Sequence, residues 1–211
     1  MSMQPFTVVT GPAAHLPLAN IDTDVIIRIE RLFSVPRDEL GKYALEALRY
    51  LPDGGENAEF PFNQEKFRGA PILLAGDNFG CGSSREGAVF ALQQMGIRCV
   101  ISSSFGDIFY NNCFQNGVLP VRLRPSEVDI LARYASDGEP LTVDLVQCRV
   151  VTADGREFPF EVSGLRREGL LHGLDDLGLT LKDDAVIRAW QSADRAARPW
   201  AWKPVARVAS A

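Results

Sequence analysis

The sequence predicts an α/β fold built on a parallel sheet, and the middle third of the chain carries the clearest signal. Three short apolar segments, at residues 71–75, 97–102 and 118–123, alternate with helix-like segments at 85–95 and 105–114. Strands that are apolar on both faces and joined by helical crossovers are typical of a parallel sheet covered by helices.

A smaller antiparallel sheet is predicted beside the parallel one. After Pro125 the chain changes character, with strand-like segments at residues 141–146 and 147–152. Residues 153–156 have the composition of a hairpin turn and lead into a third segment at 157–162. Strands joined by tight turns pair antiparallel, so the fold class is α/β with two sheets.

The remaining elements follow from alternation and from helical spacing. Residues 6–10 alternate with β-branched side chains and predict a first strand, which Gly11 and Pro12 end. Apolar side chains at helical spacing predict one helix over residues 37–50, and the following stretch to Gly69 has no clear period.

Three more helices are predicted near the end of the chain. They cover residues 126–134, 163–172 and 182–197, the last being amphipathic and opened by two aspartates. We therefore expect one domain over residues 1–198, followed by a C-terminal tail at 199–211.

Composition excludes several classes of protein. The 211 residues include 22 basic and 27 acidic side chains, giving a net charge of −5, and 46% of residues are hydrophobic. These are values of an ordinary globular protein. An acidic balance without a Lys/Arg run argues against a nucleic-acid partner, and no apolar run is long enough to cross a membrane. Residues 1–10 lack the features of a secretory signal, so we expect a cytoplasmic protein.

Cysteine and histidine are too scarce for a metal site or a disulfide framework. The four cysteines, at positions 81, 99, 113 and 148, include no pair with C-x-x-C spacing. His15 and His172 are the only histidines, and neither stands in a motif, so surface or packing roles are expected for both. We therefore expect no metal ligands in this chain.

The strongest candidate for chemistry is the glycine-rich turn GCGSSRE at residues 80–86. It follows a predicted strand and opens a predicted helix, a geometry that favours anions. It lacks the third glycine of a dinucleotide fingerprint and the Gly-Lys-Ser/Thr of a P-loop. A purely structural role, capping the helix, is the alternative, because Ser83 and Glu86 stand three residues apart, as in a capping box.

Ser83 is a candidate base, and Arg85 is a candidate residue for binding a carboxylate. Arginine binds carboxylates with a bidentate fork. A helix terminus contributes at most about 2 kcal/mol, or roughly 1.5 pKa units, whereas a hydroxyl with a pKa near about 15.7, that of water, needs far more. Ser83 can therefore act as a base only if Arg85, local N–H groups and a nearby cation act together.

At this point several motifs together resemble one family. The chain is similar to the small subunits of 3-isopropylmalate dehydratase, in the aconitase superfamily, from about Phe6 to about Ala197. The motifs occur in the family's order: NIDTD at 20–24, GCGSSRE at 80–86, SFGDIFYNN at 104–112, GVLPV at 117–121 and GLDDLGLTL at 173–181.

The resemblance implies a swivelling β/β/α three-layer domain and a hydro-lyase activity. The reaction isomerises 2-isopropylmalate to 3-isopropylmalate by dehydration and rehydration, in leucine biosynthesis. By this resemblance Ser83 is the base, Ser84 and Arg85 hold a substrate carboxylate, and Asp24 lines the site. A four-iron, four-sulfur cluster belongs to the large subunit, so this chain holds no cofactor and is active only with that partner.

Two departures from the family pattern leave the substrate open. Gly87 stands where the family often has His, and Arg28 where it often has Pro. Both allow a paralogue that hydrates another alkyl-substituted malate or maleate. A non-catalytic module that binds anions at the glycine-rich turn is the further alternative.

The segment after Ile27 is expected to set specificity. The stretch matching residues 31–33 separates substrates in the superfamily, and the position that is Arg in homologues preferring a charged group is Phe33 here. Leu32 and Phe33 would bind an alkyl group, since an unpaired buried carboxylate is costly. Alternatively both side chains simply fill the core, and Arg28 or Arg31 could swing in to supply a charge.

Overall fold

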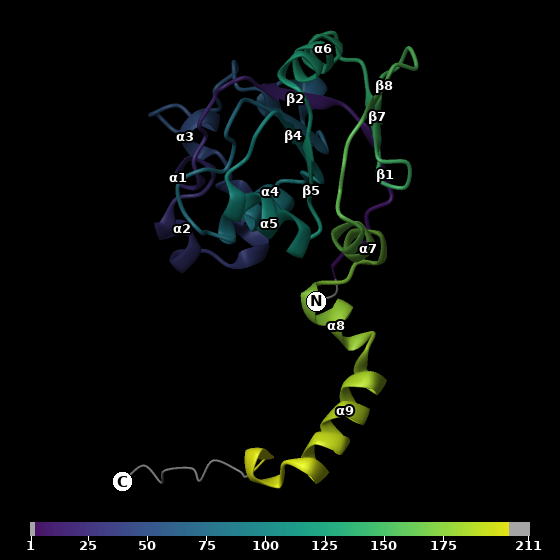
Figure 1. Cartoon of the computed structure of the whole chain (residues 1–211). Helices are drawn as coiled ribbons and strands as arrows, with labels where there is room; N and C mark the ends of the chain where they lie inside the picture. Colours follow the sequence, from purple (N-terminus) through teal and green to yellow (C-terminus); the bar gives the residue numbers. More distant parts are fainter. Residues whose placement is uncertain (1–2, 203–211) are drawn as a thin grey trace, which may run out of the picture. The chain divides into compact units, whose positions relative to one another are not determined.

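Two four-stranded sheets form the larger of the two units into which the chain divides (Figure 1). The computed structural model describes residues 3–202. The larger unit extends to Asp175 and the smaller one begins at Asp176.

The parallel sheet has the order β2-β3-β4-β5, with every neighbouring pair parallel. Helix α4 (Gly87–Gln94) connects β3 to β4, and α5 (Asp107–Gln115) connects β4 to β5. The predicted strand–helix alternation of the middle third is thus confirmed. The strands are β2 (Ala13–Leu16), β3 (Ile72–Ala75), β4 (Cys99–Ser102) and β5 (Leu119–Arg122).

The second sheet is antiparallel throughout, in the order β1-β6-β7-β8. It pairs the predicted first strand with the predicted hairpin segments, which are far apart in the sequence. Its strands are β1 (Val8–Gly11), β6 (Leu141–Asp144), β7 (Arg149–Val151) and β8 (Glu157–Pro159). The expected α/β fold with a parallel and an antiparallel sheet is confirmed.

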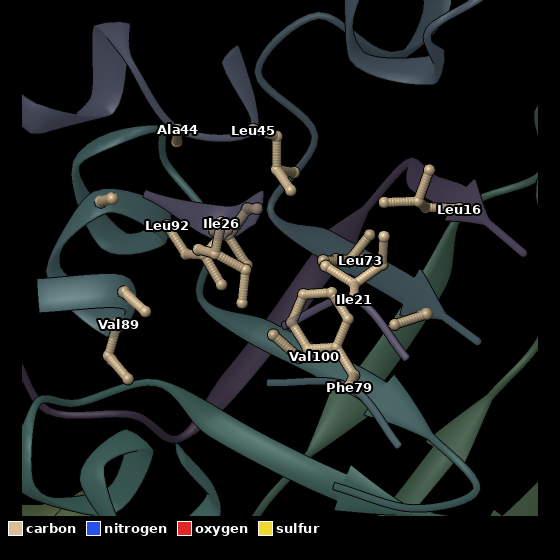
Figure 2. Packing of buried hydrophobic residues seen from close by; sticks show 14 of the residues in the cluster. Leu16, Ile21, Ile26, Ala44, Leu45, Leu73, Phe79, Val89, Leu92 and Val100 are labelled. Carbon is tan, nitrogen blue, oxygen red and sulfur yellow. The ribbon is translucent and has the colours of Figure 1, made fainter. Parts of the chain in front are cut away.

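Successive side chains of the parallel strands belong alternately to two hydrophobic cores, one on each face of the sheet. Leu73 and Val100 belong to the core on the side of α4, where Figure 2 shows them beside Ile21 and Phe79. Their neighbours Ile72 and Ile101 belong to a second core shared with the antiparallel sheet and with α6 (Pro125–Ser136). Because successive side chains of a strand point to opposite faces, a strand buried on both faces has no polar side.

The predicted helix over residues 37–50 is wrong. The segment forms a 3-10 helix, η1 (Arg37–Lys42), and a single α-helical turn, α3 (Glu46–Arg49). Between them Leu45 adopts a left-handed conformation with φ of 56°, and its N–H donates to the carbonyl of Ile26 at 2.8 Å. Leu40 and Ala44, two of the residues whose spacing predicted the helix, are buried, so that spacing reflects burial in the core and not a continuous helix.

The region before η1 forms two further short helices, and the region after α3 is held by 3-10 turns. These are α1 (Thr23–Ile26), α2 (Ile29–Ser34), η2 (Pro61–Asn63) and η3 (Glu65–Phe67).

Strand β2 was not expected, because its sequence AAHL contains no β-branched side chain. Near the end of the larger unit, α7 (Gly164–His172) confirms the helix predicted over 163–172.

The smaller unit contains α8 (Asp176–Leu181), α9 (Asp184–Ala197) and the 3-10 helix η4 (Pro199–Trp202). Helix α9 confirms the predicted amphipathic helix. The Trp202 indole N–H donates to Asp194 Oδ2 at 2.8 Å, which ties η4 to α9. The predicted domain boundary after residue 198 stays a prediction, and residues 203–211 of the predicted tail lie outside the described residues. Among residues 3–202, no helix has the length and apolarity that crossing a membrane requires.

A substitution at Gly80 tests how closely the backbone packs against the Phe109 ring. Its φ is +73°, and a Cβ there would lie 2.2 Å from Cγ of Phe109. Gly54 also has a positive φ, of +86°, but no atom within 4 Å of its Cβ position. Both Ala variants suffer left-handed strain. We expect Gly80→Ala to be less stable than Gly54→Ala by about 2 kcal/mol, the cost of overpacking, in denaturant unfolding. Equal losses at the two positions would contradict the packing described.

Candidate functional site

The candidate site is formed by the loop of residues 76–86, called the site loop, which leaves the carboxyl end of β3 and leads into α4. Ligands of open α/β sheets bind outside the carboxyl ends of the strands. On one side, Gly106 N–H donates to the Phe79 carbonyl at 2.9 Å and Asn78 N–H donates to Ser104 Oγ at 2.8 Å. The loop after β4 therefore supports the site loop.

On its other side the site loop pairs with the segment that leads into α1. Gly80 N–H donates to the Ile21 carbonyl at 2.7 Å, and Thr23 N–H donates to the Cys81 carbonyl at 3.0 Å. Asp22 caps α1, because its Oδ1 accepts a hydrogen bond from Val25 N–H at 2.8 Å. This capped turn places residues 23 and 24 directly beside the site loop.

Ser83 contacts Thr23 rather than the start of a helix. The two hydroxyl oxygens, Ser83 Oγ and Thr23 Oγ1, are 2.8 Å apart, and Thr23 is 1% exposed. Sequence reasoning missed Thr23 as a site residue, although it lies inside the NIDTD motif. The signal that could have found it is a threonine between two aspartates, just before an apolar run.

The capping box expected from Ser83 and Glu86 does not form. Helix α4 begins at Gly87, its N-cap is Glu86, and no side chain caps it. The Glu86 carboxylate instead accepts a hydrogen bond from Asn116 Nδ2 at 2.9 Å. The structural alternative for Ser83 is therefore wrong, and its hydroxyl lies outside the helix in the site loop.

Arg85 and Asp24 meet across the site. The Arg85 guanidinium donates a hydrogen bond from Nη1 to Asp24 Oδ1. The Arg85 side chain is 22% exposed and that of Asp24 57% exposed, so the pair lies at the surface of the loop. Ser84 stands between Ser83 and Arg85 and is exposed. The structure thus brings Arg85 into contact with Asp24, and it places Ser83 against Thr23, the residue next to Asp24.

The two predicted pocket residues on α2 differ sharply. Leu32 is half-buried, packs against the core beneath α4, and its methyl groups lie against Gly87. Phe33 is 87% exposed. Filling the core is therefore a correct interpretation for Leu32 and a wrong one for Phe33, whose ring stands free of the core.

The two arginines near α2 share one carboxylate. Arg28 Nε lies 3.3 Å from Glu46 Oε1 and Arg31 Nη2 lies 3.0 Å from Glu46 Oε2. The Arg31 guanidinium also stacks 4.1 Å from the centre of the Tyr43 ring, and its hydrogen bond to Glu46 raises the Arg31 pKa. Both arginines thus have a partner already. They line an open hollow of about 410 Å³ formed by Asp24, Arg28, Ile29, Glu30, Arg31 and Glu46.

The donor set of this chain does not fit an iron–sulfur cluster. Such clusters are held by converging thiolates. Cys99 and Cys113 are completely buried, and burial raises the pKa of both thiols. Cys81 lies on the site loop, but within residues 3–202 no three His, Cys, Asp or Glu side chains converge to hold a metal ion.

Comparisons with known proteins agree with this architecture. The family model described as "Aconitase C-terminal domain" matches residues 3–126, and the model described as LeuD_N matches residues 129–164. A solved structure of 3-isopropylmalate dehydratase from Methanocaldococcus jannaschii is similar, with a TM-score of 0.64 and 29% identity, covering 87% of this chain and 99% of that one.

Curated relatives match nearly the whole chain. The 3-isopropylmalate dehydratase small subunit of Cereibacter sphaeroides is 52% identical over 200 residues, which is 94% of this chain and 100% of the relative. That of Paracoccus denitrificans is 50% identical with the same coverage, and that of Agrobacterium fabrum is 48% identical over 201 residues, again 94% of this chain and 100% of the relative. Identity at this level over this length settles the family: the chain is a member of the 3-isopropylmalate dehydratase small subunits, built on the aconitase C-terminal domain.

Proposed function

We propose that this chain is the small subunit of a hydro-lyase that isomerises 2-isopropylmalate to 3-isopropylmalate by dehydration and rehydration, in leucine biosynthesis. The observation that carries the proposal is the convergence of Ser83, Arg85 and Asp24 at one loop, in a chain whose named relatives match it almost end to end. The biosynthetic role of the relatives favours the cytoplasm as its location.

Each of these residues has a chemical role in the proposal. Ser83 Oγ takes the proton from the carbon next to a substrate carboxylate. Arg85 binds a substrate carboxylate with its planar fork, and the exposed Ser84 hydroxyl donates a further hydrogen bond. Thr23 fixes the direction of the Ser83 hydroxyl, because the two oxygens are 2.8 Å apart. Asp24 holds the guanidinium in place before substrate arrives.

The chain supplies only part of what the reaction needs. Helix α4 starts four positions after Ser83, so its N-terminal dipole does little for a negative charge on that oxygen. The Thr23 hydroxyl is neutral, and Arg85 already faces a carboxylate. Departure of hydroxide from the substrate needs a Lewis acid, which this donor set does not hold. We therefore assign the four-iron, four-sulfur cluster to a large-subunit partner.

Reconstitution tests this division. We expect the isolated chain to turn over no 2-isopropylmalate and to gain activity when a cluster-loaded large subunit of 3-isopropylmalate dehydratase is added. Activity is measured by the ultraviolet absorbance of the unsaturated intermediate, and iron and sulfide are measured in each chain separately. Turnover by the isolated chain, or stoichiometric iron and sulfide in it, would contradict the proposal.

Removing the Ser83 hydroxyl tests the proposed base. In the reconstituted complex we expect Ser83→Ala to lower kcat by about 10²-fold or more, the usual effect of losing a general base. Thermal unfolding should change little, because Ser83 caps no helix.

The controls separate chemistry from packing. Ser103→Ala removes a hydroxyl from the neighbouring loop, where it bonds Asp77, and should leave kcat near that of the unchanged protein. Thr23→Val keeps the shape of its side chain and should fall between these two variants. Near-normal turnover by Ser83→Ala would place the base elsewhere.

A substrate series tests the prediction that the segment after Ile27 favours an apolar substituent on the substrate. We expect kcat/KM for 2-isopropylmalate to exceed that for homocitrate by about a hundredfold, because a third carboxylate would go unpaired at a cost of several kcal/mol. The reason is that Arg28 and Arg31 already share Glu46, and Phe33 carries no charge. Citramalate should fall between, having less alkyl surface to bury. Phe33→Arg should raise the use of homocitrate, and equal use of homocitrate by the unchanged protein would contradict the predicted preference for an alkyl group.

A further inference from the structure

The backbone of residues 82–84 in the site loop is anchored only at its two ends. Before this stretch, Thr23 N–H donates to the Cys81 carbonyl at 3.0 Å. After it, Ala88 N–H donates to the Arg85 carbonyl at 3.2 Å. Within the described part of the chain, no backbone hydrogen bond is made by the residues between these anchors. The direction in which their side chains leave the loop therefore depends on how well each end is fixed.

The second end is not fixed by a helix cap. Glu86 is the N-cap residue of α4, yet its backbone is helical, with φ of −59° and ψ of −31°, and no side chain caps the helix. An N-cap residue normally has an extended backbone, and its side chain accepts a hydrogen bond from the first turn. The fixed point at this end of the loop therefore lies outside α4.

Asn116 supplies that fixed point. It is 9% exposed and is the C-cap residue of α5. Its Nδ2 donates to Glu86 Oε1 at 2.9 Å and to the Asn112 carbonyl at 2.9 Å. Its Oδ1 accepts from Arg37 Nη2 at 3.5 Å, and the Cζ of Arg37 lies 3.4 Å from the centre of the Phe90 ring. A flipped amide would turn its oxygen toward two acceptors, so Asn116 is held with an N–H pointing at Glu86.

We propose that Glu86 is a positioning residue, because its hydrogen bond to Asn116 fixes the end of the site loop from which Arg85 projects. This inference rests on the proposed function, in which Arg85 binds a substrate carboxylate. Arg85 directly precedes Glu86, and its carbonyl is bonded within the first turn of α4, so its backbone moves with that of Glu86. The bond to Asn116 thereby sets where the guanidinium stands beside Asp24.

Substitutions of Glu86 in the reconstituted complex test the role of this hydrogen bond. We expect Glu86→Ala to raise KM for 2-isopropylmalate by about tenfold and to change kcat by less than about threefold, because a displaced Arg85 weakens binding of the ground state and the transition state alike. Glu86→Gln should keep KM within about twofold of the unchanged complex, because its amide oxygen still accepts the N–H of Asn116.

A double-mutant cycle identifies the partner. We expect Asn116→Ala to raise KM about as much as Glu86→Ala, and the double variant to differ from either single variant by less than about twofold, because each change removes the same hydrogen bond. Thermal unfolding is measured for every variant. If the buried change at Asn116 prevents folding, the comparison of Glu86→Ala with Glu86→Gln decides, since Glu86 is exposed.

Gln93→Ala is the matched control. Gln93 lies on α4, and its Nε2 donates to the backbone carbonyl of Asn116 at 2.8 Å. This variant therefore also removes a hydrogen bond that ties α4 to Asn116, but it leaves Glu86 bonded. We expect its Tm to fall and its KM to stay unchanged.

The outcomes that overturn the inference are distinguishable. If the unchanged complex is active but Glu86→Gln is impaired as much as Glu86→Ala, the charge of Glu86 matters and not its bond to Asn116. Additive effects in the cycle, or an equal rise of KM in Gln93→Ala, would also contradict the inference. If the unchanged complex turns over no alkyl malate at all, the proposed function fails, and the role assigned to Glu86 fails with it.

Discussion

The site depends on two backbone hydrogen bonds that join segments about 60 residues apart. Gly80 donates to Ile21, and Thr23 donates to Cys81, so that the site loop and the turn before α1 continue the pairing of the strands beyond the sheet. This pairing requires the chain to pass close to the Phe109 ring, which only glycine at position 80 permits. Without it, Ser83 would not meet Thr23 and Arg85 would not meet Asp24.

The same arrangement explains why the chain is incomplete as a catalyst. It places the Ser83 hydroxyl beside the neutral hydroxyl of Thr23, and it pairs Arg28, Arg31 and Arg85 each with a carboxylate. Under the proposed function, the features that would make Ser83 a base, a cation and a dry cavity, come from the large-subunit partner.

Most of the fold could be predicted from the sequence, because strands buried on both faces leave apolar runs that no surface element has. The wrong predictions concern residues whose burial does not match the backbone conformation that the sequence pattern predicts. Leu40 and Ala44 are buried at helical spacing, but at the next residue, Leu45, the backbone is left-handed and its N–H donates to the Ile26 carbonyl, so no continuous helix forms. Strand β2 is buried through alanines, which carry no strand signal.

The sequence pointed to Ser83, Arg85 and Asp24 but missed Thr23, and it did not predict the contacts among them. The spacing of Ser83 and Glu86 fits a capping box, and only the fold shows that Glu86 binds Asn116 while Ser83 faces Thr23. The contrast between the half-buried Leu32 and the exposed Phe33 is equally hidden, since neighbouring residues on a short helix carry no marker of which one faces the core.

The ion pair between Arg85 and Asp24 has a consequence for how a ligand enters. The protein's own carboxylate already holds one nitrogen of the guanidinium, Nη1. Under the proposed function, an acid that binds at Arg85 meets a guanidinium whose charge is partly neutralised, so its electrostatic gain is smaller than at an arginine with no carboxylate beside it. A lone anion such as acetate or phosphate then gains little, whereas a molecule that brings additional hydroxyl and alkyl contacts gains more.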